Sequence, residues 1–459
     1  MSRKLSYSLD DESTDLIKKY EQFLEGNGAG YFDVEELETI VDYYLRKGRT
    51  KESSNALEFG LKLHPASSTL KTKRAKIYLA IGETQKAFRI LDSVNETDDY
   101  EVVLLKIEVL IKLGRTKEAE KLANIMLEAE IEDIDNITLD LAFIYISQLN
   151  FEIALQFLLI GDKYNDENID LLFELAFCYE QLLNNEKAIE TYNRIIDIDS
   201  YLSEAWFNLG QIYFVMQDFT NAVDAYDFAL TINENDSLTS LQKAHALFQL
   251  EEYTKAIETY QSLENLTIEP WQINLFIAES YEKMEKYDEA IEFYQKSLTL
   301  ETENFDALTG IAICYLEKEE FTESLLFIRK AIEIQENAHD AWVYLAEALI
   351  GLDDIEDALV AYLKSISIEP NQPDTLMAIA NICMDTSEYS TALKYYLAAY
   401  ELDSTLEYIE LFIAVAFYKT NNISASKLYL NKAMVLNLDA TKLFLEICPD
   451  AILNDDEKL

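Results

Sequence analysis

The sequence predicts an all-α fold, built from helical hairpins that repeat along the chain. Glycine and proline are scarce in the 459 residues, with 11 and 5 copies, and this favours long stretches of helix. Apolar residues recur at spacings of three and four, as on one face of a helix, and no segment alternates apolar and polar residues as a strand does. The same pattern of residues also returns every 34 positions.

A frame of 34 residues describes this pattern, counted so that Trp206 stands at position 4. Position 20 is Ala or Ser in all twelve repeats, and position 8 is Ala or Gly in ten of them. Position 11 is Tyr in seven repeats and position 24 is Tyr in six. The repeats are expected to begin at residues 34, 68, 100, 135, 169, 203, 237, 271, 305, 339, 373 and 407.

Each repeat is predicted to form two packed helices. Positions 4, 7, 8 and 11 share one face of the first helix, and positions 20, 24, 27 and 28 share a face of the second. Small residues at positions 8 and 20 let the two backbones approach, while the larger residues fill the space beside them. Position 15 holds Gly48, Gly82 and Gly114 in the first three repeats, which marks the turn between the helices.

The motif is clearest at 203–236, where it consists of Trp206, Leu209, Gly210, Tyr213, Ala222, Tyr226 and Ala229. Repeated in phase over residues 34–440, this motif resembles the tetratricopeptide repeat family. The resemblance implies a right-handed α-solenoid, a superhelix in which each hairpin buries its apolar face against its neighbours. Basic residues at core positions (Lys71, Arg74 and Lys106) and spacings of 32 and 35 around residue 100 leave the boundaries of the second and third repeats open.

Three parts are expected along the chain. Residues 1–33 should hold a leader and a solvated capping helix over 15–26, with Ser13 or Thr14 as its N-cap. Residues 34–440 should hold the twelve repeats. Residues 441–459 should form a helix that covers the last repeat and ends at Pro449, followed by a frayed tail.

Sequence motifs for catalysis, cofactors or metals are lacking, so we expect neither an enzyme nor a cofactor. The three histidines and four cysteines lie far apart, without the spacing of a metal site or a disulfide framework. The glycine-rich residues 26–30 follow a helical pattern and are interpreted as a helix stop. The N-terminus has no apolar signal segment and no apolar run could span a membrane, so we expect a cytoplasmic location.

The formal net charge of −47 is concentrated beyond residue 125. Residues 1–125 hold 20 basic and 22 acidic side chains, whereas the remaining residues hold 18 basic and 63 acidic ones. Such an acidic field repels nucleic acids and anionic lipids, and it favours basic or neutral protein partners. We therefore expect neither nucleic-acid binding nor membrane insertion, and the oligomeric state stays open.

The family resemblance places a second stripe of each first helix, at positions 2, 5, 9 and 12, on a concave groove where peptides lie extended. In the central repeats the groove residues are Phe143, Phe173, Phe177, Phe207, Gln211, Phe214, Leu241, His245, Phe248 and Leu275. Its acidic edge consists of Asp170, Glu174, Glu204, Asp306, Asp340 and Asp374. Apolar pockets with acidic edges suit a segment with apolar anchors and Lys or Arg side chains. Alternatively, some of these side chains pack against the next repeat.

Two functions fit these patterns. The favoured one is a non-catalytic scaffold that binds an extended segment of another protein, apolar or basic, in the groove. The alternative is self-assembly, in which the acidic C-terminal repeats dock on the basic N-terminal repeats of another copy. The basic docking patch would then consist of Arg46, Lys73 and Lys76, although a solvated charged face is the simpler interpretation of this cluster.

Overall fold

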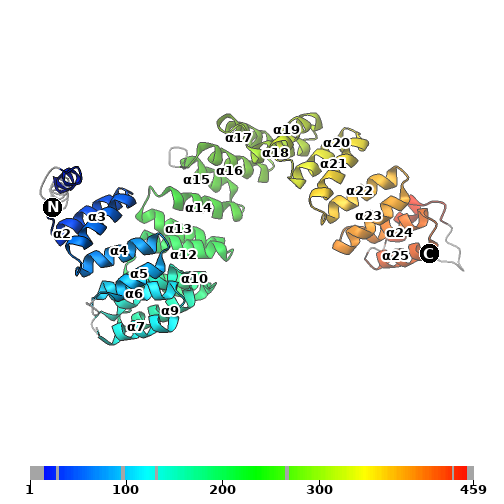
Figure 1. Cartoon of the computed structure of the whole chain (residues 1–459). Helices are drawn as coiled ribbons and strands as arrows, with labels where there is room; N and C mark the ends of the chain where they lie inside the picture. Colours follow the sequence, from blue (N-terminus) through cyan, green and yellow to red (C-terminus); the bar gives the residue numbers. More distant parts are fainter. Residues whose placement is uncertain are drawn as a thin grey trace. The chain divides into compact units, whose positions relative to one another are not determined.

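The computed structural model describes residues 15–26, 30–94, 99–129, 133–263, 268–436 and 439–451. Within these ranges every regular element is a helix (Figure 1). The chain separates into two compact units, Met1–Ile212 and Tyr213–Leu459, and each is described by itself. The expected N-cap at Ser13 or Thr14, most of the glycine-rich stretch and the expected frayed tail lie outside the described residues.

The first unit opens with a helix over residues 15–24. It continues with α2 (Val34–Arg46), α3 (Thr50–Leu63), α4 (Ser68–Ala80), α5 (Thr84–Asp92), α6 (Tyr100–Lys112), α7 (Thr116–Ala129), α8 (Ile134–Ile146), α9 (Phe151–Tyr164), α10 (Ile169–Gln181), α11 (Asn185–Ile198) and most of α12 (Ser203–Val215). Consecutive helices from α2 to α11 pack against each other, and α8 also contacts α10. The first helices of neighbouring repeats thus lie side by side.

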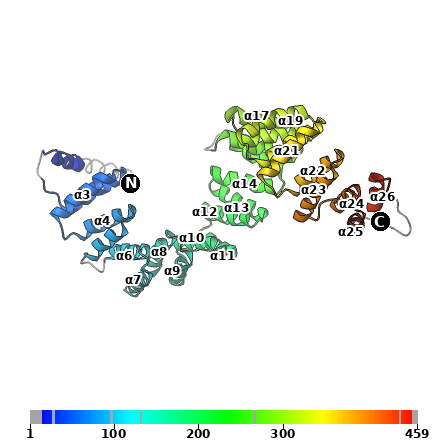
Figure 2. The same ribbon diagram turned by 45° about the vertical axis from the view of Figure 1, so that its right-hand side comes forward.

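The second unit continues the same arrangement (Figure 2). Its helices are α13 (Phe219–Ile232), α14 (Ser237–Gln249), α15 (Tyr253–Ser262), α16 (Pro270–Lys283), α17 (Tyr287–Leu300), α18 (Phe305–Glu317), α19 (Phe321–Ile334), α20 (His339–Gly351), α21 (Ile355–Ile368), α22 (Pro373–Asp385), α23 (Tyr389–Leu402), α24 (Ile409–Lys419), α25 (Ile423–Leu436) and α26 (Ala440–Ile447). Every first helix, from α2 to α24, begins within two residues of an expected repeat start.

The small residues at position 20 are fully buried in every repeat. Where this residue is a serine, its hydroxyl reaches the backbone of the partner helix. Ser324 Oγ donates to the carbonyl of Ala312 at 2.9 Å, and Ser426 Oγ donates to the carbonyl of Ala414 at 2.8 Å. Both acceptors stand at position 8 of the same repeat. The predicted close approach of the two helices at positions 8 and 20 is therefore confirmed.

The turn between the two helices has one backbone geometry throughout. Position 15 has a positive φ in every repeat, from 57° to 78°, although only the first three repeats have glycine there. Leu149 and Leu183 adopt φ values of 58° at this position. In the fifth repeat the N–H of Asn184 then bonds back to the carbonyl of Tyr179 at 2.8 Å, which ends the first helix with a Schellman motif. Glycine marked the turn in three repeats only, because the other nine accept the left-handed conformation without it.

Helices at both ends of the chain cover the terminal repeats. Ile17 and Tyr20 are buried in a cluster with Leu37 and Tyr44 of α2, so the expected capping helix is solvated on one face only. Their spacing of three residues places them on one face, and that face packs against the first repeat. At the other end, Phe444 of α26 is buried in a cluster with residues of α24 and α25.

Candidate functional site

The first unit contains a pocket of about 300 Å³ on the first helices of two neighbouring repeats. Its lining consists of Phe173, Glu174, Phe177 and Glu180 on α10, Tyr192 on α11, and Glu204 and Asn208 on α12. In the repeat frame these residues stand at positions 5, 6, 9, 12 and 24 of one repeat and at positions 2 and 6 of the next. We call this the α10–α12 pocket.

Tyr192 forms the base of the α10–α12 pocket. Its side chain is almost fully buried, and its ring meets that of Phe173 edge to face, with 6.1 Å between the ring centroids. The Tyr192 hydroxyl donates to Glu180 Oε1 at 2.6 Å. Burial and the negative charge of Glu180 both raise the pKa of the Tyr192 phenol, so it stays protonated as a donor.

This link between position 24 and the first helix recurs in the second unit. Tyr294 donates to Glu282 Oε2 at 2.6 Å, and Tyr396 donates to Asn381 Oδ1 at 2.6 Å. In each case a buried tyrosine of the second helix reaches the stripe of the first helix that the family resemblance assigns to the groove. The tyrosines therefore belong to the core and also hold polar groups of the stripe in place.

Three carboxylates surround two phenylalanine rings in the α10–α12 pocket. Burial raises the pKa of Glu174 and of Glu180, and the hydrogen bond from Tyr192 opposes the rise at Glu180. Among the described residues, no Lys or Arg forms an ion pair with these two residues or with Glu204, and Arg194 of α11 pairs with Asp162 instead. A partly buried carboxylate without a counter-ion gains from an approaching cation. Phenylalanine rings beside it can pack the aliphatic stem of a Lys or Arg side chain.

The α10–α12 pocket brings together four of the predicted site residues, Phe173, Phe177, Glu174 and Glu204. Sequence reasoning missed Glu180, Tyr192 and Asn208. Glu180 stands at position 12 of the predicted stripe, so its position could have singled it out. Tyr192 was assigned to the core alone. Asn208 stands at position 6 beside the stripe, as Glu174 does, but it is not acidic and so was not assigned to the acidic edge.

The remaining predicted residues of the first unit lie outside this pocket. Phe143 is exposed on α8, and Asp170 is exposed in the first turn of α10. Phe207 and Gln211 are half-buried on α12. These four residues stay a prediction as groove residues.

In the second unit, the predicted aromatic groove residues contact neighbouring rings. Phe214 meets Phe219, and Phe248 meets Tyr253, each edge to face with 5.3 Å between ring centroids. Leu241 and Phe248 pack on the edge of the core between α14 and α16. The two ring contacts lie within single repeats, whereas the packing of Leu241 and Phe248 on a cluster that includes α16 fits the alternative in which some of these side chains pack against the next repeat.

His245 and Leu275 differ from the expected groove positions. The Nδ1 of His245 is 2.8 Å from the Tyr260 hydroxyl, and its ring lies 4.8 Å from that of Phe276. Burial lowers the pKa of His245, so its imidazole is a neutral hydrogen-bond partner for Tyr260. Leu275 is buried in a core cluster with Ile311 of α18, so its assignment to the groove is wrong.

The predicted acidic edge in the second unit consists of Asp306, Asp340 and Asp374, which are exposed in the first turns of α18, α20 and α22. Asp306 lies near Glu279 of α16. Burial, and then the charges of Glu282 and Asp306, raise the pKa of Glu279 to about 7. Negative charge therefore gathers on neighbouring first helices of this unit as well.

The predicted basic patch is largely neutralised within the chain. Lys73 Nζ lies 2.7 Å from Asp42 Oδ1, and Lys76 forms an ion pair with Glu101. Arg46 is exposed at the end of α2, where its Nε is 3.5 Å from the carbonyl of Asp42. Both lysines are therefore occupied by carboxylates of adjacent repeats.

Comparisons with known proteins agree with this architecture. Models of the tetratricopeptide repeat match residues 170–199 and 203–236, and the model "Anaphase-promoting complex, cyclosome, subunit 3" matches residues 283–365. No curated protein sequence matches the chain. The paired helices, small residues at the crossings and matching repeat models define an α-solenoid of helical hairpins. The chain contains tetratricopeptide repeats.

Similar solved structures include MamA and a protein of Cytophaga hutchinsonii. MamA has 17% sequence identity and a TM-score of 0.34, over 38% of this chain and 94% of that chain. The C-terminal part of the TPR repeat-containing protein from Cytophaga hutchinsonii has 17% identity and a TM-score of 0.43, over 51% of this chain and 98% of that chain.

Tetratricopeptide repeats are protein–protein interaction modules, so the chain is an interaction scaffold in this general sense. Members of the family are typically non-catalytic. Across the part of the chain that the structure describes, no group of three or more His, Cys, Asp or Glu side chains could hold a metal ion. In the same residues, no helix has both the length and the apolar character that a membrane span requires.

Proposed function

We propose that the protein is a non-catalytic scaffold whose first unit binds an extended segment of another protein, with a Lys or Arg side chain of that segment in the α10–α12 pocket. The observation that supports this most is the set of three carboxylates without a counter-ion, Glu174, Glu180 and Glu204, around two phenylalanine rings. A cation there would be held by charge and by apolar contact together.

The chemistry of the pocket favours a long basic side chain over a purely apolar one. Its volume of about 300 Å³ is at the lower end for ligand sites and suits a single side chain. The aliphatic stem would lie on Phe173 and Phe177, while the cationic head would reach the carboxylates. The side chain of Asn208, on the next first helix, forms a hydrogen bond that opposes the rise in the pKa of Tyr192, so it joins α12 to this wall of the pocket.

Peptide binding by fluorescence anisotropy tests this proposal. The probes are two labelled peptides with a central Leu-Xaa-Leu in a glycine–serine context, in which Xaa is Lys or its neutral analogue norleucine. We expect the Lys peptide to bind about tenfold more tightly, because one charge pair at a partly buried site contributes on the order of 1–2 kcal/mol. Glu204→Gln should reduce this preference, because the half-buried Glu174 and Glu180 remain. Phe173→Ala should weaken binding of both peptides, because both stems lose their contact surface.

Glu167→Gln is the matched control, because Glu167 is an exposed residue just before α10 and does not line the pocket. It removes the same charge and should leave the preference for Lys unchanged. Equal binding of the two peptides by the parent protein would refute the proposal. An unchanged preference in Glu204→Gln would refute the role given to that carboxylate.

Self-assembly through the basic N-terminal repeats has weaker support, because Lys73 and Lys76 already contact Asp42 and Glu101. Light scattering at low and high salt separates the two proposals. A mass that stays monomeric at low salt argues against self-assembly, since charge-driven docking is strongest there.

We also propose a cytoplasmic location for the protein. All four cysteines, Cys178, Cys314, Cys383 and Cys448, are unpaired and buried, which suits a reducing compartment. Fractionation of the native cells tests this directly.

A further inference from the structure

Position 4 of the first helix holds a tryptophan in two repeats, and both indoles bind the same backbone group. Trp342 Nε1 donates to the carbonyl of Glu336 at 2.9 Å, and Trp206 Nε1 donates to the carbonyl of Ser200 at 3.1 Å. Both acceptors stand at position 32 of the preceding repeat, in the turn between two hairpins. Lys364, at position 26 of the tenth repeat, lies over the Trp342 ring, with its Nζ 5.7 Å from the ring centroid. The indole is thus held by a carbonyl, a cation and apolar packing.

The fifth repeat supplies a donor to the same carbonyl in another way. Its position 4 holds Leu172, which has no N–H in its side chain, and the donor comes from Arg194 at position 26. Arg194 Nη2 lies 3.3 Å from the carbonyl oxygen of Asp166, at position 32 of the fourth repeat. In the fifth, sixth and tenth repeats, therefore, a side chain of the chain itself donates to the carbonyl at position 32.

The turn before the ninth repeat has the same backbone geometry as the turn before the tenth. Glu301 ends α17 with φ −132° and ψ 95°, and Gln335 ends α19 with φ −133° and ψ 81°. Asn304 precedes α18 with φ −81° and ψ 105°, and Ala338 precedes α20 with φ −78° and ψ 99°. Because both ends of the two turns agree, the carbonyls at position 32 point the same way in both.

The ninth repeat has this carbonyl and a cation, but no indole. Position 32 of the preceding repeat is Thr302, and in the part of the chain that the structure describes no group donates to its carbonyl. Position 4 holds Leu308, and position 26 holds Lys330, which forms no ion pair with the described residues. The acceptor and the cation that accompany Trp342 are therefore both present without the ring that they hold in the tenth repeat.

A pocket of about 690 Å³ lies at this place, between α17, α18 and α19. Its lining is Leu298, Thr302, Glu303, Leu308, Phe327, Lys330, Glu333 and Ile334. Position 23 is Phe327 here and Ala in the two repeats with tryptophan at position 4, so the phenyl ring takes up part of the volume of an indole. This ring stacks on Tyr315, with 5.8 Å between the centroids, and the pocket lies beside it. We call this the α17–α19 pocket.

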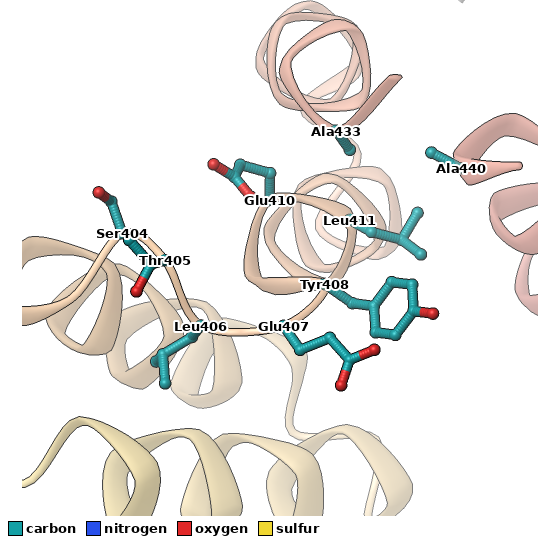
Figure 3. A pocket seen from close by; sticks show the side chains of 9 residues that line it. All are labelled: Ser404, Thr405, Leu406, Glu407, Tyr408, Glu410, Leu411, Ala433 and Ala440. Carbon is teal, nitrogen blue, oxygen red and sulfur yellow. The ribbon is translucent and has the colours of Figure 1, made fainter. Parts of the chain in front are cut away.

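The last repeat also lacks an indole, but its surroundings differ from those of Trp342. Position 4 holds Glu410, and a pocket of about 640 Å³ surrounds the start of α24 (Figure 3). Figure 3 shows Glu410 and Leu411 on opposite sides of the first turn of α24. The lining of this pocket contains no Lys, Arg or His, and six residues precede α24 where four precede α18. A missing indole alone therefore does not reproduce the site of the ninth repeat.

We propose that the α17–α19 pocket binds an indole ring, carried by a tryptophan side chain of another protein. The indole N–H would donate to the Thr302 carbonyl, and the ring would lie on Leu298 and Leu308 with the Lys330 ammonium over its face. Glu303 and Glu333 in the lining disfavour an anionic ligand of Lys330, whereas an indole is neutral. The site lies in the second unit and does not depend on the α10–α12 pocket.

Ligand-observed NMR with the full chain tests this, because the method measures weak binding of short peptides. The peptides carry Trp, 3-benzothienylalanine or Ala at the centre of a glycine–serine sequence, and the benzothienyl ring has the shape of an indole without its N–H. We expect the Trp peptide to bind about fivefold more tightly than the benzothienyl peptide, because one hydrogen bond separates them. The Ala peptide should bind at least about tenfold more weakly than the Trp peptide. Equal binding of the Trp peptide and either analogue would overturn the proposal.

A double variant with Leu308→Trp and Phe327→Ala gives the ninth repeat the residues of the tenth at positions 4 and 23. The indole of the chain itself should then fill the α17–α19 pocket and donate to Thr302. Binding of the Trp peptide should be lost, while the helical content and the melting temperature stay at the parental level. If a folded double variant still binds the Trp peptide, the ligand lies elsewhere and the proposal is wrong.

The role of the cation has its own matched pair of variants. Lys330→Gln changes an exposed residue and should weaken binding of the Trp peptide about threefold, because the contact between the ammonium and the ring is lost. Arg329→Gln is the control, since Arg329 is the exposed neighbour on α19 and does not line the pocket. It removes the same charge and should leave binding unchanged. Equal weakening in the two variants would contradict the role of Lys330.

Discussion

The carboxylate of Glu279 should make the second unit more stable at mildly acidic pH than at neutral pH. Glu279 is half-buried on α16, and burial is the main reason why its pKa rises from 4.5 to about 7. The charges of Glu282 and Asp306 raise this pKa further, while Lys283 lowers it. In the unfolded chain the carboxyl group is solvated and titrates near its ordinary value.

The sign and size of the effect follow from these two pKa values. The folded state binds the proton more tightly, so the free energy of unfolding rises as pH falls from about 7 towards 4.5. At about 1.4 kcal/mol per unit, the rise in pKa from 4.5 to about 7 corresponds to at most about 3.5 kcal/mol, and residual solvation lowers this. Glu279→Gln is neutral at all pH values. It should exceed the parent by about 1–3 kcal/mol at about pH 8 and by less than about 1 kcal/mol at about pH 5.

Urea unfolding followed by circular dichroism at these two pH values measures the effect. Because long repeat arrays can unfold in more than one step, hydrogen exchange in α16 and α18 gives the local stability as a second measurement. Glu289→Gln, an exposed residue in the first turn of α17, is the control and should keep the parent's pH dependence. If Glu279→Gln also kept that dependence, the burial argument for Glu279 would be refuted.

Three further substitutions test the packing. Leu183→Gly should raise the free energy of unfolding by up to about 1 kcal/mol. The left-handed conformation costs a residue with a side chain about 1–2 kcal/mol, and the larger backbone entropy that glycine loses on folding offsets part of the gain. Urea unfolding measures the change, and a loss of stability would contradict it. Gly310→Ala should lower it by about 1–3 kcal/mol, since its Cβ would lie 2.6 Å from the hydroxyl oxygen of Tyr294; an unchanged melting curve would show that the ring moves aside easily. Tyr192→Phe should lower it by about 1–2 kcal/mol by removing the donor to Glu180; protection from hydrogen exchange in α10 that stays at the parental level would contradict the contact.

The sequence could predict the helices and their core because the repeat recurs in a fixed frame. Position 20 had to be small for the two helices of a repeat to cross closely. The hydroxyl of Ser324 in the second helix reaches the backbone carbonyl of Ala312 in the first helix, which shows how close this approach is. The frame says less about side chains between repeats. It assigned Leu275 to the groove and treated Lys73 as free, because neither the burial of Leu275 against α18 nor the partner Asp42 follows from position within a repeat.

In the candidate site, too, some residues could be predicted from their position in the repeat and others could not. Phe173 and Glu174 could be predicted, since both stand on or beside the stripe of one first helix. Tyr192 could not, because one residue serves the core with its ring and the site with its hydroxyl.

The ion pairs of the first repeats have a consequence for how the array responds to its surroundings. Asp42 with Lys73 and Lys76 with Glu101 each join one repeat to the next, and all four side chains are partly or largely exposed to solvent. Dissolved ions weaken such exposed pairs, whereas they do not weaken apolar stacking. Rising ionic strength should therefore weaken these two links between the first three repeats, while the apolar stacking of the hairpins stays.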